Sequence, residues 1–298
     1  MTYGYGLFFA SCASVCWGIA PLLNKRALRE TGILKTNAFR ALGVLAVSVP
    51  VFFWGSAETA KELLSFSVNT YLILLLVTIM NNVVGDVFYF VAIRDIGVSL
   101  AAPITSSYPL AVAVTSWLWF NEALTFSVLV GTFSVVTGLA LLNVRAAKTR
   151  DAGSSRHLRG VVLAILAALC WATGLTLNKY LTLNGVGATT MTFWRGIFFS
   201  LMAIACLPLA SRGERETRSV SAAGALAAGG AGIAGLVAGG WLYVASLSII
   251  PMNVATPIAS SSPLISAVFA CAFMGESLRP IQWLGIMFVV AGAVAVGA

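Results

Sequence analysis

The sequence predicts an all-α integral membrane protein of ten transmembrane helices, arranged as two inverted-topology repeats of five helices each. The first observation is composition: of 298 residues, 59% are hydrophobic and 9% are charged, and the mean hydropathy is +0.94. A soluble domain has about 25% charged residues, because its surface faces water. This chain has too few charges to cover such a surface. The second and third observations are the spacing of its apolar runs and an internal repeat.

Apolar runs of the length that crosses a bilayer occur ten times. A transmembrane helix needs about 17–25 mostly apolar residues. Charged or glycine- and proline-containing breaks separate the runs. They lie approximately at 5–23, 37–54, 71–93, 97–120, 126–143, 160–181, 189–209, 222–248, 251–273 and 281–297.

The internal repeat relates residues 154 positions apart. The matches are Cys16-Trp17 with Cys170-Trp171, Asn24-Lys25 with Asn178-Lys179, Tyr89 with Tyr243, Glu122 with Glu276, Gly131 with Gly285, Gly138 with Gly292, and APITSSYPL (102–110) with TPIASSSPL (256–264). Arg40 matches Arg195 with one residue of slippage. We divide the chain into repeats at 1–144 and 160–298, joined by a basic linker at 145–159. Five helices is an odd number, so the second repeat enters the membrane from the opposite face, as in many secondary transporters.

These features together resemble the EamA domain of the drug/metabolite transporter superfamily. The resemblance rests on the doubled five-helix organisation, the tryptophan in the first helix of each half, and the P-x-x-[ST]-x-x-P-L segment followed by glutamate. It implies a transporter without naming the cargo, because relatives export amino acids and other metabolites, or carry nucleotide sugars or drugs. The small multidrug members use an acidic residue in the first helix for proton exchange. Cys16 and Trp17 stand in that region here, which argues against proton-coupled drug antiport.

The basic residues predict an orientation. On the face that carries both termini we count only Lys61, Lys179 and Arg195, and the other face carries the remaining fifteen of the eighteen. The positive-inside rule makes the second face cytoplasmic and both termini external, in the plasma (inner) membrane. The superfamily is often described with cytoplasmic termini, so the charges and the resemblance disagree. This distribution explains the net charge of +8 without a nucleic-acid partner.

Two proline pairs mark the fourth and ninth apolar runs, Pro103 with Pro109 and Pro257 with Pro263. Each proline removes a backbone donor and frees a carbonyl one turn earlier. Irregular backbone inside a membrane belongs where it faces protein or a watery cavity. The serines between the prolines either satisfy this backbone or contact a substrate; they are Ser106, Ser107, Ser260 and Ser261.

Asp86 is the one acid well inside a predicted span. An ionisable group at that depth is costly and marks a candidate functional site. Asn82, Asp86 and Tyr89 form a polar stripe on one helix face, because they are four and three residues apart. Asp86 is therefore a candidate to bind substrate or a coupling proton. The alternatives are a structural pair with Arg94 and an acid held neutral.

Aromatic side chains supply candidate walls for a pocket that suits an organic amine or zwitterion. They are Trp17, Tyr89, Tyr108, Trp171, Trp194 and Tyr243. Packing and interfacial anchoring are the alternatives for each of them. We assign six of the glycines of 222–248 to close helix packing and not to a site; they are Gly229, Gly230, Gly232, Gly235, Gly239 and Gly240.

Charged residues that recur in both halves suggest a pair of alternating gates. Arg40 or Lys25 would meet Glu276 on the cytoplasmic face, and Arg195 or Lys179 would meet Glu122 on the other. Basic residues at span ends also snorkel to the lipid headgroups, and a glutamate near a helix start favours its dipole. Both remain alternatives.

The sequence thus favours a secondary transporter that moves a small polar organic metabolite, amino-acid-like or amine-bearing, by alternating access and in the efflux direction. A passive channel, or a drug or nucleotide-sugar carrier of the same superfamily, is the alternative. An intramembrane enzyme is disfavoured, because we find no catalytic motif, His157 is the single histidine, and the five cysteines lack metal-ligand spacing. We expect no cofactor and no metal. The expected partners are the substrate and the lipid bilayer; a coupling proton and the choice between monomer and homodimer stay open.

Overall fold

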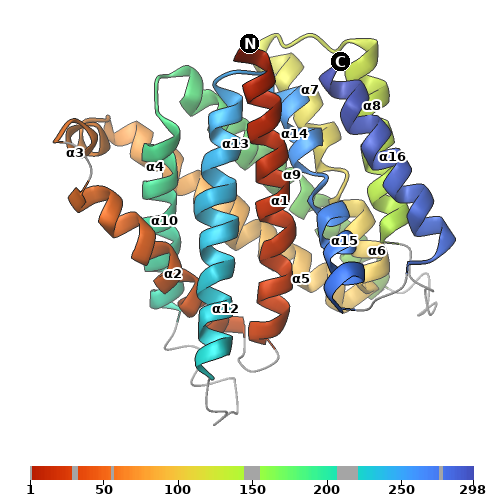
Figure 1. The fold of residues 1–298 in the computed structure, drawn as a ribbon, viewed down its shortest axis with the longest axis horizontal. Helices are drawn as coiled ribbons and strands as arrows, with labels where there is room; N and C mark the ends of the chain where they lie inside the picture. The colour runs from red at the N-terminus through yellow and green to blue at the C-terminus, as the bar shows by residue number, and fades with distance from the viewer. Residues whose placement is uncertain (1, 29–32, 55–56, 144–154, 207–220, 275–277) are drawn as a thin grey trace.

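The computed structural model describes residues 2–28, 33–54, 57–143, 155–206, 221–274 and 278–298 (Figure 1). All regular structure in these ranges is helical, which confirms the predicted all-helical class. The elements are α1 (Thr2–Leu28), α2 (Ile33–Trp54), α3 (Ala57–Leu64), α4 (Val68–Ile79), η1 (Met80–Val84), α5 (Gly85–Ile96), α6 (Val98–Thr105), α7 (Tyr108–Phe120), α8 (Phe126–Leu142), α9 (Ser155–Leu183), α10 (Ala188–Ala205), α12 (Ala222–Gly232), η2 (Ile233–Gly239), α13 (Gly240–Leu247), α14 (Met252–Ala259), α15 (Ser262–Met274) and α16 (Pro280–Gly297).

Six helical segments of the described chain are long and apolar enough to cross a membrane, judged by length and composition. They are Thr2–Ala27, Val68–Ile96, Ser155–Leu183, Ala188–Ala205, Ala222–Leu247 and Pro280–Gly297, and Phe126–Leu142 is a shorter apolar helix. Each of the ten apolar runs in the sequence coincides with one helix or with a chain of helical segments. The linker predicted at 145–159 lies largely outside the described residues.

Two apolar runs are each split into two helices. The break between α6 and α7 falls at Ser106 and Ser107, and the break between α14 and α15 falls between Ala259 and Ser262. Pro109 is the second residue of α7, where a helix needs no backbone donor. The proline spacing that suggested irregular backbone therefore marks these breaks correctly.

Two other apolar runs contain a π-helical turn in their middle. These turns are η1, between α4 and α5, and η2, between α12 and α13. A π-turn bonds residues five apart and inserts one extra residue into the helix, and such turns often occur at functional sites. The two turns overlap when the halves are superposed by the repeat offset of 154 positions. The helix at the equivalent position of each half therefore contains a π-turn at equivalent residues.

The first helix of each half packs chiefly inside the other half. In Figure 1, α1 runs beside α12 and α13 on one flank and beside α14 and α15 on the other. Likewise α9 packs against α4, η1, α5, α6 and α7. Both termini lie at one end of the molecule, and the chain leaves α1 at the opposite end (Figure 1). The two halves are thus interlocked.

The last helices of the two halves, α8 and α16, cross through glycines. A Cβ built on Gly138 would lie 2.6 Å from the carbonyl oxygen of Gly285, and one on Gly292 would lie 2.6 Å from that of Gly131. Small residues allow membrane helices to approach this closely. The two contacts occur in opposite order along the two helices, so α8 and α16 run antiparallel. Because Gly131 and Gly285 are repeat partners, as are Gly138 and Gly292, the contact is the same from either side.

Candidate functional site

The repeated tryptophans join the first helix of each half to the π-turn of the other half. The indole N–H of Trp17 donates to the carbonyl of Gly235 at 2.9 Å, and the indole N–H of Trp171 donates to the carbonyl of Asn81 at 3.2 Å. Trp17 and Trp171 are repeat partners, and so are Asn81 and Gly235. The two bonds are therefore equivalent. Each gives a partner to a carbonyl in an irregular helical turn, which inside a membrane has no water to bond.

Glycines at equivalent positions make room for both indoles. A Cβ on Gly85 would lie 2.7 Å from Cδ1 and Nε1 of Trp171, and one on Gly239 would lie 2.6 Å from the same atoms of Trp17. Gly85 and Gly239 are repeat partners as well. The prediction that helix 222–248 uses glycines for close packing is consistent with Gly239. We call the two indole bonds with their glycines the Trp–π contacts.

Tyrosines from the predicted pocket surround the same indoles. The ring centroids of Trp17 and Tyr243 are 5.3 Å apart, and those of Trp171 and Tyr89 are 5.4 Å apart, again an equivalent pair. Tyr108 contacts Trp171 at 6.2 Å. Tyr243 is 1% exposed, and its hydroxyl lies 2.8 Å from Oγ1 of Thr256. The structure therefore gathers the predicted aromatics, apart from Trp194, into two related clusters.

Trp194 lies in another cluster. Its indole donates to the carbonyl of Leu63 at 2.7 Å, and its ring packs against Tyr71 and Phe198. These contacts correspond to helix packing, which was the alternative to a pocket role for this residue.

The serines at the helix breaks bond mainly to nearby backbone. Ser107 donates to the carbonyl of Ile104 at 2.6 Å, Ser260 to that of Pro257 at 2.9 Å, and Ser261 to that of Ile258 at 2.6 Å. Ser260 also lies within hydrogen-bonding reach of the Tyr108 hydroxyl. Ser106 is partly buried at the same break. Ser261 Oγ also lies 3.0 Å from Ser14 Oγ. The structural role that we considered for these serines thus accounts for one contact each of Ser107, Ser260 and Ser261.

Asp86 lies close to Arg40, and the Trp171 indole is also within reach of its carboxylate. The suggested pair with Arg94 is wrong, because Arg94 Nε lies 3.4 Å from the carboxylate of Asp95 instead. The sequence placed Arg94 near Asp86 only by its position along one helix, whereas Arg40 comes from α2. Asn82, the third member of the polar stripe, lies partly buried in η1.

Arg40 has several partners besides Asp86. Its Nη1 donates to Oδ1 of Asn37 at 2.9 Å, and its guanidinium carbon lies 5.4 Å from the ring centroid of Phe199. Arg195, its repeat partner, lies near Tyr243. Nε of Arg195 is buried and has no hydrogen-bond partner, and no carboxylate of the described chain forms an ion pair with this side chain.

Glu122 ties the end of α7 to the start of α14. Its carboxylate accepts the backbone N–H groups of Met252 at 2.9 Å and Asn253 at 3.1 Å, and lies 3.4 Å from Nζ of Lys179. Lys179 also donates to the carbonyl of Leu247 at 2.8 Å. Of the two bases that the sequence offered to Glu122, the structure places Lys179 beside it and not Arg195. Glu276, the acid of the other suggested gate, lies outside the described residues.

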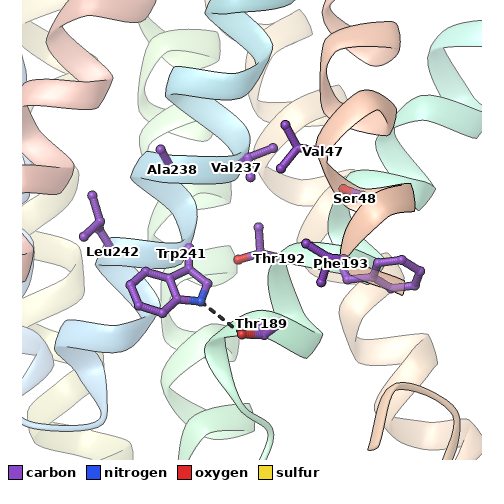
Figure 2. Close-up of a pocket in the computed structure, with 10 residues that line it drawn as sticks. Val47, Ser48, Thr189, Thr192, Phe193, Val237, Ala238, Trp241 and Leu242 are labelled. Atoms are coloured by element: carbon purple, nitrogen blue, oxygen red, sulfur yellow. Dashed lines mark hydrogen bonds between the residues drawn. The ribbon is translucent and has the colours of Figure 1, made fainter. Parts of the chain in front are cut away.

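A separate, mainly apolar pocket of about 420 Å³ lies between α2, α10 and the helix that contains η2 and α13 (Figure 2). It is lined by Val47, Ser48, Val51, Thr189, Thr192, Phe193, Val237, Ala238, Trp241 and Leu242. The Trp241 indole donates to Thr189 Oγ1 at 3.2 Å, as Figure 2 shows. None of the predicted site residues lines it. No sequence pattern predicts this pocket, because small and aliphatic side chains in a span are typical of ordinary helix packing.

Comparison with known proteins agrees with this architecture. A multi-pass membrane protein built from two repeats is the class that the helices and the repeated contacts define. The model of the EamA-like transporter family matches residues 4–144 and again residues 158–298. The chain belongs to the EamA-like transporter family, which confirms the resemblance seen in its sequence. It is a transporter by family.

A relative and a solved structure are similar over nearly the full length. A protein named "Uncharacterized transporter", from Archaeoglobus fulgidus, is 22% identical over 279 residues, which cover 93% of this chain and 92% of that protein. A crystal structure described only as that of a protein has a TM-score of 0.80 and 15% identity, and covers 97% of this chain and 95% of its own. The structural similarity supports the fold alone.

Proposed function

We propose that this transporter is a secondary carrier that moves a small polar organic metabolite, amino-acid-like or amine-bearing, by alternating access and in the export direction. The observation that carries the proposal is the pair of Trp–π contacts. Each half fixes its first helix to the irregular turn of the other half, through the same atoms. Two halves joined by two equivalent contacts can rock about them without separating, as in carriers built from repeats.

We propose further that ten helices cross the membrane as two inverted repeats, 1–144 and 160–298, joined by 145–159. The antiparallel crossing of α8 and α16 supports this topology, because a two-fold axis in the membrane plane places equivalent helices antiparallel. The charge asymmetry supports an inner-membrane protein with cytoplasmic basic loops and external termini.

The proposed cargo site lies between the two aromatic clusters. It includes Trp17, Asn82, Asp86, Tyr89, Ser106, Ser107, Tyr108, Trp171, Tyr243, Ser260 and Ser261. Cargo contact at the most buried of these, Tyr243 and Ser260, requires the halves to move apart. A coupling proton on Asp86 is an open part of the proposal.

The proposed gates lie at the two ends of this site. Glu122 and Lys179 close the end that carries the termini, because they join α7 and α9 to the start of α14. The other gate would be formed by Lys25 and Glu276, which are the repeat partners of Lys179 and Glu122, together with Arg40. Arg195 is the remaining basic residue of the gate hypothesis, and its surroundings suggest a different use, developed below.

Counterflow in proteoliposomes tests the carrier. Vesicles that contain the purified protein are loaded with one unlabelled amino acid, and uptake of the labelled form is followed for each of the twenty in turn. A carrier gives saturable uptake that the internal pool accelerates. Single-channel currents, or flux that does not saturate and ignores the internal pool, would establish the passive channel instead.

A further inference from the structure

The two halves differ at one position that faces a buried arginine. In the first half Asp86 lies near Arg40, although the two side chains do not come within the 4.0 Å of an ion pair. The repeat partner of Asp86 is Gly240, and the repeat partner of Arg40 is Arg195. The second half therefore keeps the cation and lacks the carboxylate.

Gly240 lies on the same side of its helix as the neighbour of Arg195. Tyr243 is three residues after Gly240 in α13, and residues three apart share a helix face. Tyr243 lies near Arg195, and its repeat partner Tyr89 lies near Asp86. In sequence and in position on its helix, Gly240 thus corresponds to Asp86.

There is room for a side chain at Gly240. A Cβ built on it would meet no heavy atom of its surroundings within 4 Å, although Gly240 itself is buried. Gly4, Gly97 and Gly185 also meet none, but they are exposed. Among the glycines that the structure describes, Gly240 alone is both buried and free of such a contact.

Arg195 lies on α10, which packs against α13, and it forms no ion pair within the described part of the chain. Nε of Arg195 and Nε of Arg40 are both buried without a hydrogen-bond partner. Arg40 nevertheless donates through Nη1 to Asn37 and has the Asp86 carboxylate near it, whereas the neighbour of Arg195 is the uncharged Tyr243. A charge within a membrane protein is costly unless it is paired. A guanidinium binds a carboxylate through two parallel N–H···O bonds, which makes it the preferred base for such a group.

We propose that the space beside Gly240 and Arg195 is the carboxylate subsite of the cargo. The carboxylate of the transported molecule takes the place beside Arg195 that the Asp86 carboxylate takes beside Arg40. The cargo completes the second half by supplying the acid that its sequence lacks. This inference rests on the proposed transport function, because it names one charged group of the transported molecule.

A tethered carboxylate tests the subsite without any cargo. Gly240→Asp puts a carboxylate at this position, and Gly240→Asn has the same shape without the charge. We expect the Asp variant to melt about 2–4 °C above the Asn variant. A gain of about fivefold in the folding equilibrium constant raises the melting temperature of a chain of about 150–250 residues by that amount. The difference should vanish when Arg195→Gln is added to both. Equal melting temperatures, or a difference that survives Arg195→Gln, would overturn the subsite.

A second measurement uses added ligands and does not depend on the Arg195 variant. The probes are acetate, L-alanine and inorganic phosphate, with acetamide and alaninamide as controls that lack the carboxylate. Acetate or L-alanine should raise the melting temperature of the wild type, and Gly240→Asp should weaken this effect about tenfold in ligand concentration. The amides should have no effect.

The outcomes separate this inference from the carrier proposal. Stabilisation by phosphate alone would overturn the carboxylate assignment in favour of a phosphate group, free or from a lipid. Stabilisation of wild type and Gly240→Asp alike would place the anion elsewhere and overturn the subsite. Neither result depends on counterflow, and a failure of counterflow leaves the melting comparison intact.

Discussion

Glu122 allows the proposed closure of the terminal end to be tested by one conservative substitution. Glu122→Gln keeps the size of the side chain and one carbonyl oxygen, but removes the charge. In the structure the carboxylate makes three contacts, to the backbone N–H groups of Met252 and Asn253 and to Nζ of Lys179. The variant retains at most part of them and leaves Lys179, which is 8% exposed, without its counter-ion.

The size of the effect follows from these contacts. A hydrogen bond to a charged group contributes about 1.5–3 kcal/mol and a neutral one about 0.5–1.5 kcal/mol. Losing the charge should therefore cost the closed arrangement about 1–3 kcal/mol, which is a shift of about 5- to 150-fold between two states. The variant should open this end more often and still fold, because only this arrangement contains the contacts.

Cysteine labelling measures the opening. Ser260 is 3% exposed and lies behind the closure, so Ser260→Cys in a background without the five native cysteines serves as the reporter. A membrane-impermeant thiol reagent added on the face that carries the termini should label it about 5- to 150-fold faster in the Glu122→Gln background. Glu62→Gln is the matched control, since Glu62 accepts a bond from Thr190 at 2.9 Å but is part of no ion pair in the described chain. An unchanged labelling rate, or the same increase in the control, would refute the closure.

Three further predictions follow from other features. Trp171→Phe should lower the free energy of unfolding by about 0.6 kcal/mol and by no more than about 1.7 kcal/mol, the average and the maximum for interhelical hydrogen bonds in a membrane protein. Trp283→Phe on the exposed surface should not lower it, and equal melting temperatures of the two variants would contradict the Trp–π contact. Asp86→Asn should insert and fold but take up an amine-bearing cargo poorly, and wild-type uptake with unchanged pH dependence would make Asp86 structural. A C-terminal alkaline phosphatase fusion should be active, because the termini are predicted external; activity only of a cytoplasmic reporter would reverse the orientation.

The helices could be predicted from sequence because hydropathy and length determine them locally. A run of about 20 apolar residues has no stable alternative to a helix in a bilayer, since its backbone must bond to itself. The breaks beside Pro109 and Pro263 could be predicted for the same local reason. The π-turns could not, because Met80–Val84 and Ile233–Gly239 share no sequence signature.

The contacts between the halves could not be predicted from the sequence, for a different reason. The repeat shows that Trp17 and Trp171 are equivalent, but not that each bonds to a carbonyl in the opposite half, because that partner depends on tertiary packing. Arg94 was a plausible partner for Asp86 by position along the chain, and Arg40 could be found only in three dimensions. Gly240 was grouped with the packing glycines, although its pairing with Asp86 in the repeat was the available signal.

Departures from the repeat carry a consequence for mechanism. If the two halves had identical sequences, the states closed at either end would be related by the two-fold axis and would have equal energy. A resting preference, and a cargo held in one orientation, must therefore come from positions where the halves differ. Asp86 and Gly240 form one such position, and Asn81 and Gly235 form another, next to the two Trp–π contacts. The first pair gives one half an internal acid and leaves the other half to take an acid from the cargo, so the same two residues that break the symmetry would also select the charge of what is carried.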